Sequence, residues 1–216
     1  MKIFKFGGAS VKDAINIKNV AKILQQEETE NTLIVISAMG KMTNAFEEVI
    51  DAYTTKSEEL PKKLNFIEDF HKNIMADLFD KNHTIYKEID ILFGELSWFL
   101  SKNTSKKYNY VYDQIICFGE LLSTKIISAY LTTIGIQNNW FDVRSYIKTD
   151  SNYRDAKVDW ELTEKMITTK VDRNILNITQ GFLAGNDTEN TTTLGREGSD
   201  YTAGIFAYCL YAESVT

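Results

Sequence analysis

The sequence predicts an α/β protein, a three-layer αβα sandwich with a mainly parallel sheet and a helical insertion. Short, continuously apolar runs such as TLIVIS at 32–37 are typical of strands buried on both faces of a parallel sheet. Amphipathic stretches of helical length alternate with these runs, which favours helices on both faces of the sheet. A block at about 44–112 carries charged and large apolar residues at helical spacing and no strand-like alternation, so we interpret it as the insertion.

The chain begins with a predicted βαβ unit. Residues 2–6 (KIFKF) alternate and stop at a glycine pair, which predicts a short strand followed by a tight turn. A helix is expected to begin at Ser10, because Asp13 three positions later has the spacing of a capping box. The buried face of that helix repeats every three or four residues, at Ala14, Ile17, Ala21 and Leu24. The strand at 32–37 follows and completes a right-handed crossover.

The second half of the chain continues the alternation. Residues 113–135 predict a long helix that ends at Gly135, and 138–143 return to strand character. A polar stretch of loop and helix covers 144–172, and 174–185 predict another buried strand. Ser199 or Asp200 is expected to cap the last helix. Its apolar face consists of Ala203, Phe206, Ala207 and Leu210.

Composition narrows the class of function. The net charge of −6 and the pI near 5.1 disfavour nucleic acid and anionic membranes as partners, because both attract basic surfaces. No run of about 18 consecutive apolar residues is present, and the start lacks the apolar core of a signal peptide. We therefore expect a cytoplasmic protein that acts on small molecules and has no membrane partner. Cys117 and Cys209 lie in helix-like stretches and are expected to be reduced, buried thiols.

Polar clusters follow three of the predicted strands. They lie at residues 5–8, at 37–40 and from Gly181 onward. Ligands of parallel α/β sheets bind at the carboxyl ends of the strands, where these clusters meet. The sequence therefore predicts one ligand site at this edge of the sheet.

The first cluster, KFGGASV, has the composition of a phosphate site. Gly7 and Gly8 allow backbone N–H groups to approach a phosphate, a helix start at Ser10 adds a positive dipole end, and Lys5 supplies a full charge. The alternative is a plain strand-to-helix turn with an exposed lysine. The spacing matches neither a P-loop nor a dinucleotide-binding fingerprint.

The segment TTTLGREGSD is the second candidate. Arg196 stands between two glycines and suits a carboxylate, while Ser199 and Asp200 open a helix whose N–H groups bind anions. The alternative is a surface loop with a solvated arginine and an ordinary helix cap.

Glu120 is a third candidate because it interrupts a strongly apolar helix. A carboxylate at such a position needs a cationic partner, which is either a substrate ammonium group or a nearby side chain such as Lys125. His71 and His83 are expected to be solvated surface residues, and no resident metal is predicted, since no ligands stand at metal-binding spacing. The aromatic residues Trp98, Phe99, Tyr108, Tyr110 and Tyr112 are expected in the core of the insertion.

The order KFGGAS, VISAMG, FGEL, FDVR, TQGF and TTTLGREGSDYTA resembles the catalytic domain of the aspartate kinases (aspartokinases), within the amino-acid kinase superfamily. The resemblance spans nearly the whole chain. It implies the amino-acid kinase fold and the transfer of the γ-phosphate of ATP, with Mg²⁺, to the side-chain carboxylate of L-aspartate. That reaction gives 4-phospho-L-aspartate on the route to lysine, threonine and methionine.

The resemblance also implies residue roles. Lys5 matches the catalytic lysine and Asp200 the aspartate that orders it, while Gly7 and Gly8 match the phosphate loop. The residues matching the amino-acid pocket are Ser37, Thr43, Glu120 at the ammonium group, Phe182, Thr193, Arg196 at a carboxylate, and Ser199. Two positions depart from the family, which usually has threonine in place of Ala9 and glycine in place of Glu197.

The family continues beyond the point matching Thr216, into the segment that holds adenine and ribose and then into two ACT domains. The resemblance thus implies that residues 1–216 are an incomplete catalytic domain without regulatory ACT domains, with little kinase activity alone, from a full-length homo-oligomer. Two alternatives stay open. One is another kinase of the superfamily, acting on glutamate or a nucleotide. The other is a non-catalytic amino-acid-binding or assembly module with the same fold.

Overall fold

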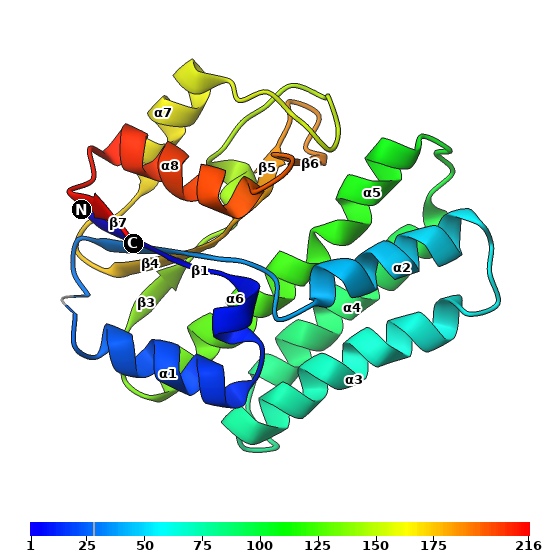
Figure 1. Cartoon of the computed structure of the whole chain (residues 1–216), viewed down its shortest axis with the longest axis horizontal. Coiled ribbons are helices and arrows are strands. Elements are labelled where there is room, and N and C mark those ends of the chain that lie inside the picture. Colours follow the sequence, from blue (N-terminus) through cyan, green and yellow to red (C-terminus); the bar gives the residue numbers. More distant parts are fainter. Residues whose placement is uncertain (28) are drawn as a thin grey trace.

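The computed structural model describes residues 1–27 and 29–216 and is built on a five-stranded sheet (Figure 1). The strand order is β3-β4-β2-β1-β7, and the four neighbouring pairs are all parallel. The strands are β1 (Lys2–Phe6), β2 (Thr32–Ile36), β3 (Asn138–Trp140), β4 (Leu176–Gln180) and β7 (Ser214–Val215). Every residue of β2 and β4 is buried, which confirms the interpretation of these apolar runs as central strands.

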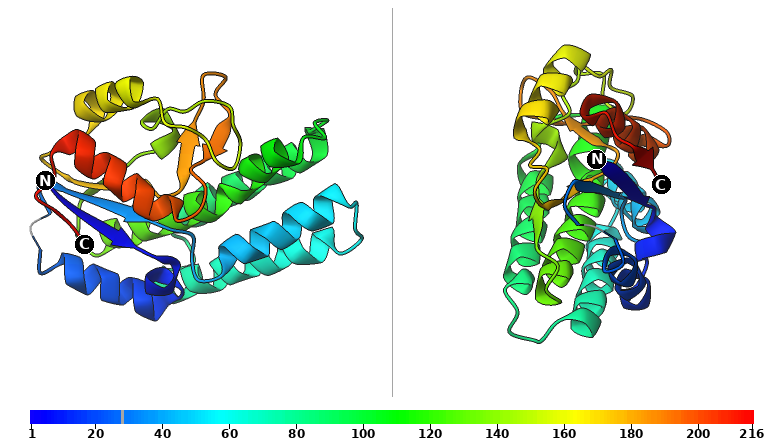
Figure 2. Two further views of the ribbon diagram at one scale, coloured as in Figure 1. Left: turned by 45° about the horizontal axis from the view of Figure 1, so that its top comes forward. Right: turned by 90° about the vertical axis from the view of Figure 1, so that its left-hand side faces the viewer.

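Helices cover both faces of this sheet (Figures 1 and 2). On one face α8 (Gly198–Leu210) packs over β1 and β2, with α7 (Trp160–Lys170) against it. On the other face lie α1 (Ala14–Leu24) and α6 (Phe118–Thr133), and α6 contacts β2, β3 and β4. The predicted three-layer α/β sandwich is confirmed.

The block predicted as an insertion consists of helices that extend to one side of the sheet (Figure 2). They are α2 (Met42–Thr54), α3 (Leu60–Leu78), α4 (Ile85–Lys102) and α5 (Tyr108–Ile116). The expected single helix at 113–135 is instead the end of α5 followed by α6, with Cys117 between them.

By length and composition the run Tyr108–Thr133 could cross a membrane, but 72% of its most apolar 18-residue stretch is buried within the fold, as in a core helix.

Several predicted boundaries are wrong for local reasons. The glycine pair leads into a short 3-10 helix, η1 (Gly8–Val11), and α1 begins only at Ala14. Its cap is Asp13, whose carboxylate accepts a hydrogen bond from the Asn16 N–H at 2.8 Å, while Ser10 is exposed. Asp13 directly precedes the helix, so its carboxylate reaches a free N–H of the first turn, whereas Ser10 lies three positions earlier and does not.

The predicted strand at 174–185 is also divided. Phe182 has a left-handed φ of 68°, which ends β4 and starts β5 (Leu183–Gly185) in a new direction. β5 pairs antiparallel with β6 (Thr191–Thr193), a strand hidden in the TTT run. Helix α8 begins after Glu197, which has a φ of 56° and no capping side chain, so Ser199 and Asp200 lie inside the first turn rather than before it.

The expectation of a solvated His71 is wrong. This side chain lies on α3, is fully buried and contacts the rings of Phe70 and Phe93. His83 is half-buried. Trp98, expected in the core, is 65% exposed. Both cysteines are free and buried, as predicted.

Candidate active site

A cavity of about 470 Å³ lies where the end of β1 and the loops after β2 and β4 meet the insertion. It brings together most of the residues singled out from the sequence: Lys5, Ser37, Thr43, Glu120, Phe182, Thr193, Arg196, Ser199 and Asp200. Gly7, Gly8 and Ser10 do not line it. Residues nearly 200 positions apart therefore share one polar cavity at the carboxyl edge of the sheet.

Lys5 and Asp200 form an ion pair at the β1 side of the cavity. The Lys5 Nζ lies 2.9 Å from the Asp200 Oδ1, and the Lys5 side chain is only 24% exposed. A Cβ at Gly7 would lie 3.4 Å from that Nζ, so the lysine passes close over the glycine backbone. The Asp200 carboxylate on α8 thus positions the ammonium group of Lys5 at the cavity.

Gly8 has a structural task. A Cβ at this position would lie 2.8 Å from the carbonyl oxygens of Ala38 and Gly40, and the Gly40 N–H donates to the Gly8 carbonyl at 2.9 Å. Only glycine permits this approach of the two loops. The glycine therefore draws the loop after β2, which carries Ser37, against the loop after β1.

Glu120 is the most unusual ionisable side chain of the cavity. It is 3% exposed in the first turn of α6, and its Oε1 accepts a hydrogen bond from the Ala38 N–H at 3.3 Å. Its Oε2 is buried and has no partner among the described residues. Burial raises the pKa of this carboxyl to about 8.

Lys125 does not neutralise Glu120, so that alternative is wrong. The Lys125 Nζ lies 3.3 Å from a Glu88 carboxylate oxygen and 3.9 Å from the centre of the Trp140 ring. Lys125 lies about one turn further along α6, and its side chain points toward Glu88 and Trp140 rather than toward Glu120. Glu120 thus lines the cavity, and among the described residues its buried Oε2 has no hydrogen-bond partner and its carboxyl no ion pair with a protein cation.

Arg196 is held on a tight turn at the start of α8. Gly195 has a φ of 77° and Glu197 one of 56°, so the turn presents Arg196 and Glu197 together at the cavity. Within residues 1–27 and 29–216, the Arg196 guanidinium has neither an ion pair nor a hydrogen bond. An unpaired guanidinium beside a cavity is available to an anionic ligand.

The turn fits its surroundings closely. A Cβ at Gly181 would lie 2.5 Å from the Ser199 Cβ, and one at Gly198 would lie 2.5 Å from the Phe182 ring. The start of α8 is thereby pressed against the end of β4. This contact fixes Ser199 and Asp200 relative to the sheet.

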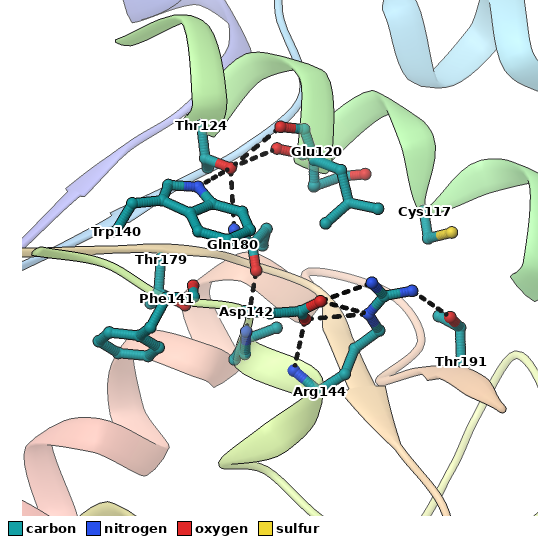
Figure 3. A network of polar contacts seen from close by, with 12 residues as sticks. Cys117, Glu120, Thr124, Trp140, Phe141, Asp142, Arg144, Thr179, Gln180 and Thr191 are labelled. Atoms are coloured by element: carbon teal, nitrogen blue, oxygen red, sulfur yellow. Dashed lines mark hydrogen bonds and ion pairs between the residues drawn. The ribbon is translucent and has the colours of Figure 1, made fainter. Parts of the chain in front are cut away.

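A network behind the cavity fixes the helix that carries Glu120 (Figure 3). The Thr124 hydroxyl donates to the Glu120 carbonyl and accepts from the Gln180 amide at 2.9 Å and the Trp140 indole at 3.0 Å. Gln180 also accepts from the Val143 N–H. These bonds tie α6 to β3 and β4, so the position of Glu120 depends on the sheet.

A second part of the same network fixes β6 (Figure 3). The Arg144 guanidinium pairs with the Asp142 carboxylate through two nitrogens and donates to the Thr191 hydroxyl at 2.9 Å. Gln114 on α5 bonds both backbone groups of Thr191. The strand that carries Thr193 is therefore held from both sides.

Comparison with known proteins decides the family. The model of the amino acid kinase family matches residues 1–216. The chain belongs to this family. Lysine-sensitive aspartokinase 3 of Escherichia coli is 31% identical over 99% of the chain, and aspartokinase 1 from the chloroplast of Arabidopsis thaliana is 32% identical over 93%.

A crystal structure of E. coli aspartokinase III in complex with aspartate and ADP superposes on the whole chain with a TM-score of 0.89 at 30% identity. The chain spans less than half of these proteins: 47% and 37% of the two relatives and 48% of the crystallised chain. The resemblance predicted from the motifs is confirmed at the level of the family.

Two side chains that the sequence did not single out as site residues, Tyr112 and Arg154, also line the cavity. Tyr112 was assigned to the insertion core, and nothing in the polar stretch around Arg154 distinguishes it by sequence. Asp113, next to Tyr112, carried a signal that could have been used. It interrupts the apolar run seven residues before Glu120, which puts both carboxylates on one side of the helical run.

The described residues contain no group of three or more histidine, cysteine, aspartate or glutamate side chains placed to hold a metal ion. In this family member the cavity carboxylate nearest the lysine is Asp200, at 63% exposure.

Proposed function

We propose that this chain is the catalytic part of an aspartate kinase. The reaction is transfer of the γ-phosphate of ATP to the side-chain carboxylate of L-aspartate, giving 4-phospho-L-aspartate for lysine, threonine and methionine synthesis. One observation carries the proposal. A single cavity holds a buried carboxylate with a free oxygen, an unpaired guanidinium and an anchored lysine.

The three groups match the three charges of aspartate. The free Oε2 of Glu120 suits an ammonium group, because a buried acceptor without a partner is costly until a donor arrives. Arg196 suits the α-carboxylate in a bidentate pair. The side-chain carboxylate is then directed toward Lys5 and the start of α8, lined by Ser37, Thr43, Phe182, Thr193 and Ser199.

The chemistry requires alignment more than proton transfer. An aspartate side chain is ionised at neutral pH, so its attack needs no general base. Two anions must instead be held together while charge on the phosphoryl group is neutralised. Lys5, oriented by Asp200, supplies a positive charge there, and the loop of Gly7, Gly8 and Ser10 is proposed to face the phosphates. Mg²⁺ bound to ATP would supply further neutralisation.

The comparisons support the coarse part of this proposal. The matching crystal structure contains aspartate and ADP, and the relatives are aspartokinases. The remaining parts extend the resemblance: a cytoplasmic location, a homo-oligomeric full-length protein, and little or no turnover by residues 1–216 alone. Appreciable aspartyl phosphate formation by the 216-residue chain would contradict the last of these.

Calorimetry tests the amino-acid site. We expect the 216-residue chain to bind L-aspartate, and Arg196→Ala to weaken that binding about tenfold to a hundredfold, the loss of charge-assisted hydrogen bonds. Lys22→Ala is the matched control, since it removes a positive charge from the exposed side of α1. Equal affinities for the unaltered chain and Arg196→Ala would contradict the proposal.

Turnover separates the alternatives. The full-length protein that contains this chain is expected to phosphorylate aspartate in preference to glutamate and UMP. Preference for either of the others would indicate a different kinase of the family. Aspartate binding that depends on Arg196, with no phosphoryl transfer by the full-length protein, would instead indicate a binding module.

A further inference from the structure

We propose that Arg154 is a second carboxylate-binding arginine of this cavity, which contacts the α-carboxylate of the amino-acid substrate together with Arg196. The inference rests on the proposed function and adds a specificity-determining residue to it. Arg154 belongs to the loop before α7 and lines the same cavity as Arg196.

The guanidinium of Arg154 is oriented by aromatic rings, and its positive charge lowers the pKa of the buried Asp113 carboxyl against the larger effect of burial. Its central carbon lies 4.3 Å from the centre of the Tyr112 ring and 5.7 Å from that of Tyr108. Among the described residues it forms no ion pair, and the only hydrogen bond of Arg154 is made by its backbone N–H. Stacking on an aromatic face leaves the N–H edge of a guanidinium free for a planar anion.

The backbone is held in a conformation that arginine rarely adopts. Arg154 has a φ of 73°, in the left-handed region. Its N–H donates to the buried carboxylate of Asp113 at 3.0 Å, and the same carboxylate accepts from both the N–H and the hydroxyl of Thr193. One buried anion therefore fixes Arg154 and Thr193 together. Strained backbone that its surroundings hold in place is common at binding sites.

The loop of Arg154 touches the turn of Arg196. A Cβ at Gly195 would lie 2.8 Å from the Asp155 Oδ1 and 3.5 Å from the Arg154 carbonyl oxygen. The two arginines thus approach the cavity from adjoining segments. Lys5 and Asp200 belong to β1 and α8, whereas Arg154 is anchored to α5, so we assign it to the amino-acid end rather than the phosphate end.

The opposite charges of Arg196 and Glu197 explain why a second arginine, Arg154, would strengthen carboxylate binding in this cavity. Glu197 lines the cavity next to Arg196, and its carboxylate repels a substrate carboxylate at the same place. Arg196 and Glu197 together carry no net charge. Arg154 adds a second guanidinium to the lining of this cavity, which an α-carboxylate can contact together with Arg196.

Arg154→Gly is the informative variant, because glycine adopts a positive φ freely and removes only the side chain. We measure binding of L-aspartate and of L-aspartic acid α-amide, which lacks the α-carboxylate, to the 216-residue chain by calorimetry. Arg154→Gly is expected to lose about tenfold or more in aspartate affinity, with a change of less than about twofold for the α-amide. Arg154→Lys keeps the charge but not the planar fork and should fall between.

Lys157→Ala is the matched control, since it removes an exposed positive charge from the same loop and should leave both affinities unchanged. Unchanged aspartate affinity in Arg154→Gly would overturn the inference, and so would an equal loss for both ligands, which would show that Arg154 acts through the fold. Failure of the unaltered chain to bind aspartate would refute the proposed function, and this inference with it. Aspartate binding that needs Arg196 and not Arg154 would refute the inference alone.

Discussion

Three buried ionisable side chains, Asp113, Glu120 and His71, are accommodated in different ways. Asp113 accepts three hydrogen bonds, and burial nevertheless raises its pKa to about 6. Glu120 keeps one oxygen without a partner at the cavity. The His71 Nδ1 forms a hydrogen bond with the Ile67 carbonyl, and its Nε2 is buried in the insertion without a hydrogen-bond partner among the described residues. Of the three, only Glu120 combines an unsatisfied atom with a place in the lining of the cavity, which is why we propose that it contacts the ammonium group.

His71 should make the protein sensitive to acid. Burial lowers its pKa from 6.5 to about 4, so the unfolded chain takes up a proton at a pH where the folded chain does not. The contribution of this residue to stability is therefore complete above pH 6.5 and is lost as the pH falls toward 4, a loss of about 3 kcal/mol. Urea unfolding of the chain and of His71→Leu at pH 7 and pH 4.5 measures this loss. The variant should lose less stability than the unaltered chain; parallel losses would contradict the account.

At the scale of elements, the contact between β4 and α8 determines the site. The turn at Gly181 and Phe182 ends β4, and α8 starts directly against it, with Ser199 in contact with Gly181. The apolar run 174–185 predicted the strand but not its interruption. Nothing local to the run indicates that the helix beginning at Gly198 packs on Gly181, because such a contact is tertiary.

Two alanine substitutions test this contact. Gly181→Ala places a Cβ 2.8 Å from the Ser199 Cα, so the start of α8 must move, with an expected loss of about 1–3 kcal/mol in stability and weaker aspartate binding. Gly204→Ala is the control within α8, since its Cβ would meet no atom within 4 Å apart from the adjacent backbone of its own helix, and it should add about 0.5–1 kcal/mol to the stability. Urea unfolding and calorimetry measure both quantities. Similar behaviour of the two variants would show that the close approach has no consequence.

Helix starts were predicted less well than helix interiors. Asp13 rather than Ser10 caps α1, and Glu197 rather than Ser199 precedes α8. In each case the sequence offers several polar residues in a row, and the one that caps is selected by where the preceding strand releases the chain. The buried faces were predicted because their spacing is a property of the helix alone.

At the scale of the whole molecule, the cavity lies where the sheet meets the helices α2–α6. Side chains of α5 hold this boundary together: Gln114 bonds Thr191 and Asp113 bonds Thr193, both on β6. The strand β1 and the start of α8 supply Lys5 and Asp200 to the cavity. The helices α2, α5 and α6 supply Thr43, Tyr112 and Glu120. A ligand bound in this cavity would contact both parts of the fold.

The fold class followed from patterns that repeat within single elements. Lys5, Glu120 and Arg196 could be selected because each is a charge in an unusual local setting, and parallel sheets gather such residues at one edge. Arg154 could not, since it lies in an ordinary polar stretch. Only its position against Tyr112, Asp113 and Gly195 distinguishes it.

The most direct test of the central claim counts protons. With a pKa of about 8, roughly nine-tenths of the Glu120 carboxyl is protonated at pH 7 in the free protein, and contact with an ammonium group favours its ionised form. Calorimetric titration with L-aspartate at pH 7, in buffers of different ionisation enthalpy, should therefore show release of nearly one proton from the unaltered chain and none from Glu120→Gln. Binding without proton release, or with the same release in both proteins, would contradict an ammonium group held by Glu120.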